Sequence, residues 1–141
     1  MCREGASWEV HCMAKTIALI FGVIYTLVGV AGFLSPLGGT FGMSPEPLLG
    51  VFYINLVHNI VHLTIGISGL LMAGTVENAV RYLRVFGIIL VLVAVAGFIR
   101  AIEASIHGYL PIGGNDVWLH LASGLIMLWG ASTAGRPAQA S

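Results

Sequence analysis

Charged residues are scarce in this chain. Six lysines and arginines and six aspartates and glutamates make up only 9% of its 141 residues, whereas 57% are hydrophobic and the mean hydropathy is +0.95. In soluble domains about a quarter of the residues are charged, so this composition excludes an ordinary soluble protein. The two signs balance, which leaves no basic surface to bind nucleic-acid phosphates. We therefore expect a chain that spans a membrane and has no nucleic-acid partner.

Cysteine is also scarce, and the motifs of common enzyme classes are absent. Cys2 and Cys12 form no C-x-x-C pair, which excludes a cysteine-based zinc site. The chain has no G-x-S-x-G nucleophile, no H-E-x-x-H zinc motif and no phosphate-binding loop. Every acidic residue lies near a terminus, in a loop or at the end of an apolar run, so no carboxylate pair is expected inside the membrane for acid–base chemistry. We predict that the protein is not an enzyme.

Four apolar runs are long enough to cross the hydrocarbon core of a bilayer, which takes about 20 residues of helix. The runs are continuous and do not alternate in polarity, so they predict helices rather than the strands of a barrel. The sequence thus predicts an all-α, integral membrane four-helix bundle with spans at about 16–35, 48–73, 82–104 and 117–134. This transmembrane domain, 16–135, lies between an N-terminal segment, 1–15, with Met1 or Met13 as its start, and a short tail, 136–141.

The distribution of lysine and arginine predicts the orientation. Four of these residues flank one side of the spans, and Arg100 alone flanks the other: the four are Lys15, Arg81, Arg84 and Arg136. By the positive-inside rule, we expect a multi-pass protein of the bacterial inner membrane with both termini in the cytoplasm. Near the outer side, we expect an interfacial set of salt bridges formed by Arg100, Glu103, His107 and Asp116.

The chain contains an internal repeat. Residues 20–34 and 85–99 are identical at nine of fifteen positions, and the second and fourth runs share the pattern H-L-x-x-G at His62 and His120. We predict two tandem two-span hairpins related by pseudo-twofold symmetry along the membrane normal. Repeated small residues, such as Gly22 and Gly87, allow close approach of helices in lipid.

These motifs resemble a bacterial family catalogued as domain of unknown function 4383. The resemblance rests on three elements: H-N-I-V-H-L at 58–63 followed by Gly66, R-Y-L-R at 81–84 with Gly87, and W-L-H-L at 118–121 with Gly124. It covers nearly everything from the first apolar run to the fourth, and it implies a small four-span membrane protein. The family has no activity to carry over, so the resemblance leaves function open.

Three histidines within the predicted spans are the candidate functional residues. His58 and His62 are four residues apart and share one face of a helix, and His120 lies on the last span. Polar groups at membrane depth are costly unless they are paired, so such histidines are functional candidates by default. We favour the simplest interpretation, in which neutral imidazoles donate hydrogen bonds to carbonyl or hydroxyl groups and hold the helices together.

The alternative is that these histidines bind a cofactor. His62 and His120, facing each other across the pseudo-twofold axis, form a natural axial pair for haem b, and one of them could bind the magnesium of a chlorophyll, with His58 as a further ligand. Zinc or copper would find the three histidines but no carboxylate or thiol nearby on the same helices, so we expect no metal site.

We therefore predict a non-catalytic structural or accessory component of a bacterial membrane or membrane complex, with no cofactor. The alternative is a haem- or chlorophyll-binding subunit of a redox or photosynthetic assembly that uses His62 and His120. The expected partners are membrane lipids, and other membrane subunits or further copies of the chain are additional candidates.

Overall fold

The computed structural model describes residues 6–134, with side chains from Cys12 onward. The predicted tail 136–141, with Arg136, lies outside the described residues, as do residues 1–5 of the N-terminal segment. The described chain is mainly α-helical, which confirms the predicted all-α class. Its elements are α1 (Ala6–Ala31), the short 3-10 helix η1 (Ser35–Leu37), β1 (Glu46–Leu48), β2 (Phe52–Ile54), α2 (Leu56–Met72), α3 (Val76–Phe98), α4 (Arg100–Ile106) and α5 (Asn115–Ala134).

Three of the described helices are long and apolar enough to cross a membrane. They are Cys12–Ala31 of α1, all of α3 and all of α5. Helix α2 is also apolar, but it has 17 residues and is shorter than these three. The membrane character expected from composition therefore has a structural counterpart in these helices.

Helix α2 begins later than the second predicted span. The span was expected from residue 48, but Glu46–Leu48 and Phe52–Ile54 pair as an antiparallel hairpin, and the helix begins at Leu56. Leu49 and Gly50 turn the chain with φ angles of 52° and 70°, a left-handed conformation that ends any helix. Asn55 then caps α2, because its side chain accepts a hydrogen bond from the backbone N–H of His58.

The third predicted span, 82–104, is divided in the structure. Helix α3 starts earlier, at Val76, where Thr75 caps it by accepting from the N–H of Asn78. It ends at Phe98 because Ile99 is extended (φ −89°, ψ 97°), and the separate helix α4 follows from Arg100. The expected extension of the third span is thus a helix of its own.

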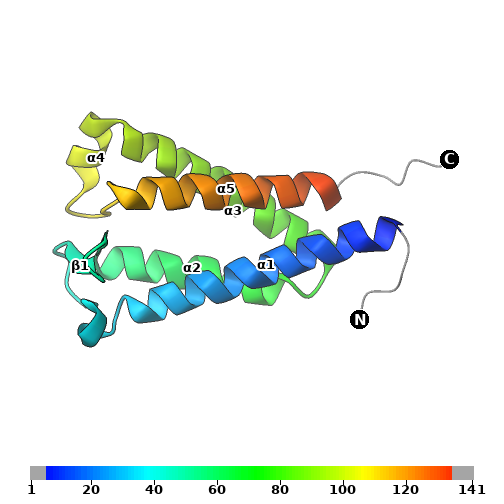
Figure 1. Ribbon diagram of the computed structural model, residues 1–141, viewed down its shortest axis with the longest axis horizontal. Helices are drawn as coiled ribbons and strands as arrows, with labels where there is room; N and C mark the ends of the chain where they lie inside the picture. The colour runs from blue at the N-terminus through cyan, green and yellow to red at the C-terminus, as the bar shows by residue number, and fades with distance from the viewer. Residues whose placement is uncertain (1–5, 135–141) are drawn as a thin grey trace.

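The helices associate in two close pairs, α1 with α2 and α3 with α5 (Figure 1). Glycines line both contacts: Gly22 of α1 lies against Gly66 and Gly69 of α2, and Gly87 of α3 lies against Gly124 of α5. A Cβ atom added at Gly22 or at Gly87 would lie 3.1 Å from the carbonyl oxygen of Gly66 or Gly124, respectively. Such close backbone approach is how helices pack in lipid, where burial from water supplies no drive.

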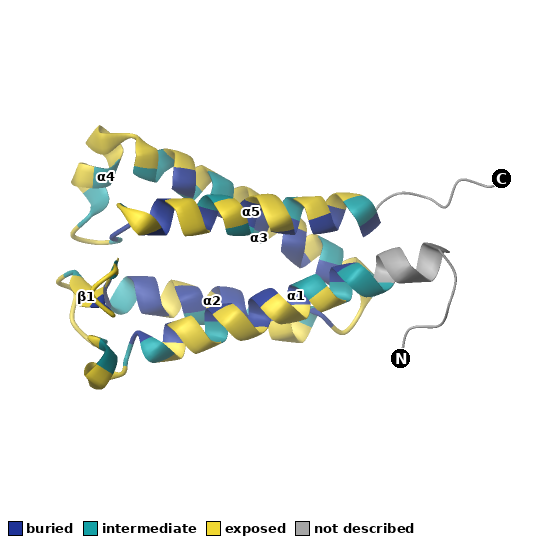
Figure 2. Cartoon of the chain, in the orientation of Figure 1, coloured by how far each residue is buried: buried dark blue, intermediate teal, exposed yellow. Residues whose placement is uncertain are grey.

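Large apolar side chains lie on the outside of the helices as well as in the interior. Figure 2 shows exposed residues along the outer sides of the helices, and many of these are large and apolar, such as Leu27, Leu71, Leu92 and Leu125 at 64%, 76%, 62% and 54% exposure. The interior has an apolar core of aliphatic, aromatic and small residues, and it also holds a set of buried polar side chains: Asn55, His58, Asn59, His62, Asp116 and His120. Apolar surface of this extent on all four long helices suits a lipid environment.

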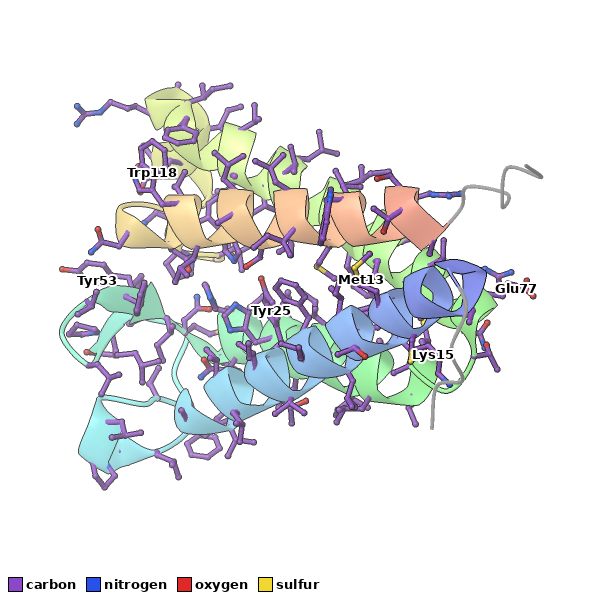
Figure 3. The ribbon with its side chains drawn as sticks, turned by 45° about the vertical axis from the view of Figure 1, so that its right-hand side comes forward. Met13, Lys15, Tyr25, Tyr53, Glu77 and Trp118 are labelled. Carbon is purple, nitrogen blue, oxygen red and sulfur yellow. The ribbon has the colours of Figure 1, made fainter. Side chains whose placement is uncertain are left out.

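The two ends of the molecule differ. The hairpin β1–β2 and helix α4 lie at one end, called here the loop end, and the α2–α3 connection lies at the other, called here the terminal end (Figure 1). Figure 3 places Tyr53 and Trp118 at the loop end, and Lys15 and Glu77 toward the terminal end. The buried polar residues belong to the first two turns of α2 and α5 and to the N-cap of α2, on the loop-end side of the interior.

Candidate functional site

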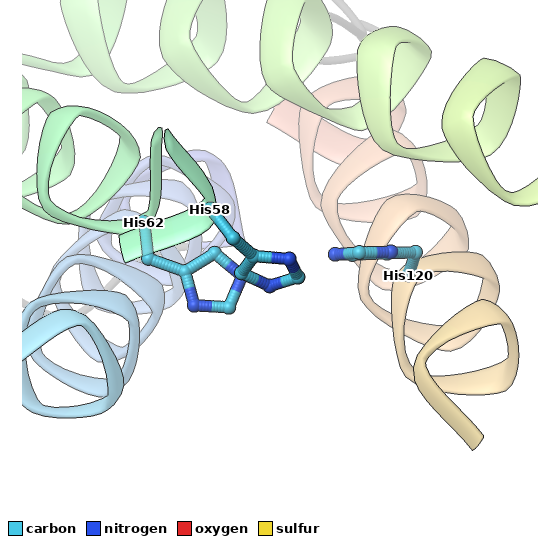
Figure 4. A group of neighbouring side chains, drawn as sticks. All are labelled: His58, His62 and His120. Atoms are coloured by element: carbon cyan, nitrogen blue, oxygen red, sulfur yellow. The ribbon is translucent and has the colours of Figure 1, made fainter. Parts of the chain in front are cut away.

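Three histidines from two helices meet in the interior. His58 and His62 come from successive turns of α2, and His120 comes from the second turn of α5. Figure 4 shows the His120 ring pointing across the space between the helices toward the other two. Their exposed fractions are 2%, 8% and 5%, so all three rings are buried. The structure thus brings together all three histidines singled out in the sequence, and we call them the histidine cluster.

Hydrogen bonds fix the position of His58. Its Nδ1 lies 3.1 Å from the carbonyl oxygen of Pro111, and because a carbonyl only accepts, this nitrogen carries the proton. Its Nε2 is then a lone-pair nitrogen and lies 3.1 Å from Nε2 of His62. The edge of the Tyr25 ring and the His62 ring meet in a T-shaped contact with centroids 5.1 Å apart. The tautomer of His58 is therefore set by the loop that precedes α5.

Asp116 joins the histidine cluster. Its Oδ2 lies 3.3 Å from Nδ1 of His120 and 4.0 Å from Nε2 of His58, and the residue is only 5% exposed. The 3.3 Å contact lacks hydrogen-bond geometry, so Asp116 Oδ2 and His120 Nδ1 are buried polar atoms with no hydrogen-bond partner among the described residues. A carboxylate buried in this way is costly unless a positive charge is near.

Two expectations about Asp116 are wrong. It was expected in a salt-bridge set at the outer interface, but only the pair His107–Glu103, at 2.9 Å, forms among the described members of that set. The argument against a metal site assumed that no carboxylate lay near the histidines on the same helices, and Asp116 lies one helical turn before His120. The physical reason is that the first turn of α5 is itself buried, so an acid at a helix end is not at the surface.

The sequence contained a signal for Asp116 that spacing within one helix did not reveal. In the repeat register that pairs His62 with His120, His58 pairs with Asp116. The pattern H-x-x-x-H in α2 therefore corresponds to D-x-x-x-H in α5. When the H-L-x-x-G alignment is extended by four residues toward the N-terminus, Asp116 aligns with His58, which is one of the candidate histidines.

The side-chain amides of Asn55 and Asn59 donate to loop carbonyls and not to the histidine rings. The Asn59 side chain donates to the carbonyls of Gly32 and Thr40, at 2.6 and 3.1 Å. Asn55 donates to the carbonyls of Met43 and Tyr109, at 3.1 and 2.9 Å. These amides tie the loops of both halves to α2 and close the loop end over the cluster.

Space around the histidine cluster is limited. A cavity of about 40 Å³ lies beside His58, His62 and His120, and a second of about 120 Å³ is lined by polar groups that include Tyr25, Asp116 and Ser123. The second cavity has room for a few water molecules at about 30 Å³ each. Neither volume would hold a haem or chlorophyll ring without separation of the helices.

The three histidines are arranged so that they could hold a small ion. One ring nitrogen from each lies within 4.8 Å of the others. Imidazole nitrogens are ligands for zinc, copper, iron and nickel. The described residues thus include a compact, buried donor set with a carboxylate beside it.

Comparison with known proteins places most of the chain in a single family. The model of the domain of unknown function DUF4383 matches residues 15–132. No curated protein and no solved structure matches the chain.

Proposed function

Since the chain belongs to the DUF4383 family, to which no function is assigned, we propose that it is a four-span integral membrane protein that acts as a non-catalytic accessory component of a bacterial membrane complex. The exposed apolar surface of the long helices carries this proposal. Large apolar side chains are exposed on every long helix, whereas six polar side chains are buried inside. A protein of this kind is stable in lipid and presents outer faces that can pack against other membrane subunits.

The proposal of four spans includes α2 despite its length. Its 17 residues extend about 25 Å, close to the roughly 30 Å of a hydrocarbon core. It packs along α1, one of the helices long enough to cross. Because α1 and α2 are antiparallel neighbours, α2 would return the chain across the same layer.

The proposal of two equivalent hairpins draws support from matched contacts. Gly22 faces the Gly66 carbonyl as Gly87 faces the Gly124 carbonyl. Two further pairs of contacts occupy equivalent positions in the repeats. Gly66 contacts Thr26 as Gly124 contacts Val91, and Gly32 contacts Asn59 as Gly97 contacts Val117. This agreement favours a pseudo-twofold relation along the membrane normal, with α1–α2 and α3–α5 as its two units.

A non-catalytic role is favoured by the closure of the interior. The buried polar groups lie beneath loops held by Asn55 and Asn59, and the cavities beside them are small. The cavities that reach these groups between the helices are far smaller than the roughly 300 Å³ at which typical substrate pockets begin. A haem or chlorophyll ring would need still more space than these cavities offer, so we favour the accessory role over the cofactor-binding alternative.

Photo-crosslinking in native membranes tests the accessory role. A photoreactive residue placed at an outward position on each long helix, Leu27, Leu71, Leu92 or Leu125, samples the lipid-facing surface. An accessory component should give discrete protein adducts, with another subunit or with a second copy of the chain, from the positions on one face and lipid adducts from the rest. Lipid adducts from all four positions would contradict the proposed role in a complex.

A further inference from the structure

We propose that His58, His62 and His120 bind one divalent transition-metal ion, with zinc as the reference ion, and that Asp116 orients His120 and balances the charge. The inference adds a metal site to the membrane protein described above. It rests on the geometry of the histidine cluster rather than on the proposed accessory role.

The distance between the two α2 histidines fits a shared ion. Two nitrogens bound to a tetrahedral zinc ion at about 2.0–2.1 Å lie about 3.3 Å apart. Nε2 of His58 and Nε2 of His62 are 3.1 Å apart. One ring nitrogen of His120 lies within 4.8 Å of one ring nitrogen of each of the other two histidines, so a movement of the His120 ring by about 1.5 Å or less would complete a three-histidine set.

The second ring nitrogens of two ligands already have the partners that metal-binding histidines use. A ligating histidine donates its other N–H to a backbone carbonyl or a carboxylate, which fixes the tautomer and the ring. Nδ1 of His58 donates to the Pro111 carbonyl, and Nδ1 of His120 faces the Asp116 carboxylate at 3.3 Å. In both residues this arrangement leaves Nε2 for the ion.

Polar packing alone accounts for only half of the cluster. One hydrogen bond between His58 and His62 and one to Pro111 satisfy the α2 side. On the α5 side, Asp116 Oδ2 and His120 Nδ1 have no hydrogen-bond partner among the described residues, although both residues are 95% buried. A bound cation supplies the positive charge that this buried carboxylate lacks, and drawing His120 toward the ion aligns its N–H with Asp116.

The three imidazole donors also determine which class of metal ion the site prefers. Three neutral imidazoles favour zinc and related ions over magnesium or calcium, which prefer oxygen ligands. The cavity of about 120 Å³ beside His62, Asp116 and His120 leaves room for a water molecule in a fourth position.

Metal analysis of the full chain purified in mild detergent tests the site. The protein is stripped with a chelator, reloaded with Zn²⁺ or Co²⁺ alone, and assayed by elemental analysis and by the visible absorption of Co²⁺. We expect one ion per chain and the absorption of four-coordinate Co²⁺. His62→Gln and His120→Gln should weaken binding by at least about 10–100-fold, and Asp116→Asn should weaken it by a similar factor through loss of the orienting carboxylate.

His107→Gln is the matched control, because His107 lies on α4, is partly exposed and pairs with Glu103 outside the cluster. It should bind the ion as the wild type does. Circular dichroism and gel filtration establish that each variant is folded. For any variant that does not fold, the wild type supplies the test: Zn²⁺ should raise the melting temperature of the stripped protein.

Three results would overturn the proposal. The first is folded wild type that takes up no stoichiometric ion and is not stabilised by Zn²⁺. The second is binding of wild-type strength in folded His62→Gln and His120→Gln. The third is a stoichiometric Soret or Qy band, which would assign the histidines to a tetrapyrrole. None of these results bears on the crosslinking test, so failure of the metal site and failure of the accessory role are distinguishable.

Discussion

At the scale of single residues, the side chains of Asn55, His58 and Asn59 each bind one or two backbone carbonyls from another part of the chain. Asn55 holds those of Met43 and Tyr109, Asn59 holds those of Gly32 and Thr40, and His58 holds that of Pro111. Carbonyls in loops have no helix or sheet partner, and in a membrane protein they must be satisfied within the protein. The H-N-x-x-H element therefore organises the loop end as well as presenting imidazoles to the interior.

Asn59→Ala should destabilise the protein by about 1–3 kcal/mol, because it leaves the Thr40 carbonyl without its donor and removes the side-chain hydrogen bond to the Gly32 carbonyl, which keeps only the N–H of Thr40. Thr64→Ala on the same helix is the control. Thr64 is exposed and its hydroxyl bonds only to the Ile60 carbonyl, one turn earlier, so its loss should cost little. Thermal unfolding in one detergent measures both, and equal melting temperatures would contradict the role assigned to Asn59.

Asp116→Asn should have opposite effects on the stability of the metal-free and zinc-loaded protein. Without an ion, the neutral amide avoids the cost of a buried carboxylate that has no hydrogen bond, so the variant should melt at or above the wild-type temperature. With Zn²⁺, the wild type should melt higher, because only the carboxylate balances the ion. Melting curves with chelator and with Zn²⁺ test this reversal, and a variant less stable than wild type in chelator would contradict it.

At the scale of elements, the sequence predicted the long helices better than their ends. Continuous apolar runs located α1, α3 and α5, because a lipid-exposed helix needs apolar residues on most of its surface. The stretch from Leu48 to Ile54 is also continuously apolar apart from Gly50, so composition alone did not distinguish the β1–β2 hairpin from a helix. The turn depends on φ angles at Leu49 and Gly50, and leucine gives no local sign of a left-handed conformation.

The sequence predicted the three histidines of the candidate site but not Asp116, because the burial of Asp116 depends on helix packing. Spacing of four residues placed His58 and His62 on one face, and the repeat connected His62 with His120. The inward direction of Asp116 depends on how α5 packs, and a carboxylate at the start of a helix is more often a cap or a surface group. Only the comparison of the two repeats carried information about its burial.

Gly97→Leu and Gly32→Leu should destabilise the protein strongly, because each glycine lies where two segments meet. A Cβ atom at Gly97 would lie 2.6 Å from Cγ2 of Val117 and closer still to the Ile112 carbonyl, and one at Gly32 would strike the Asn59 amide. Inserting a large side chain into a packed contact typically costs about 1–3 kcal/mol and here also displaces backbone. Leu27→Ala, at a site 64% exposed, is the control and should change the melting temperature little in detergent. Equal stability of the three variants would mean that these glycine contacts do not hold the helices together.

At the scale of the whole molecule, the two ends suit different sides of a membrane. Lys15 and the start of α3, with Arg81 and Arg84, belong to the terminal end. The loop end carries Arg100 and exposed aromatic residues, Tyr53, Tyr109 and Trp118, which are typical of the lipid headgroup region. The basic residues thus favour a cytoplasmic terminal end, and the aromatic residues favour an interfacial loop end.

Single cysteines at the two ends should react from opposite sides of the membrane. Gly74→Cys lies in the α2–α3 connection at the terminal end, and Gly108→Cys lies after α4 at the loop end. Both positions tolerate a side chain, since the nearest atom to a Cβ at Gly74 is 3.9 Å away and no atom lies within 4 Å of one at Gly108. In a background with Cys2→Ser and Cys12→Ser, an impermeant maleimide should label Gly108→Cys in intact cells and Gly74→Cys only after permeabilisation. The reverse pattern would invert the orientation, and labelling of both sites in intact cells would mean that the chain between them does not cross the membrane.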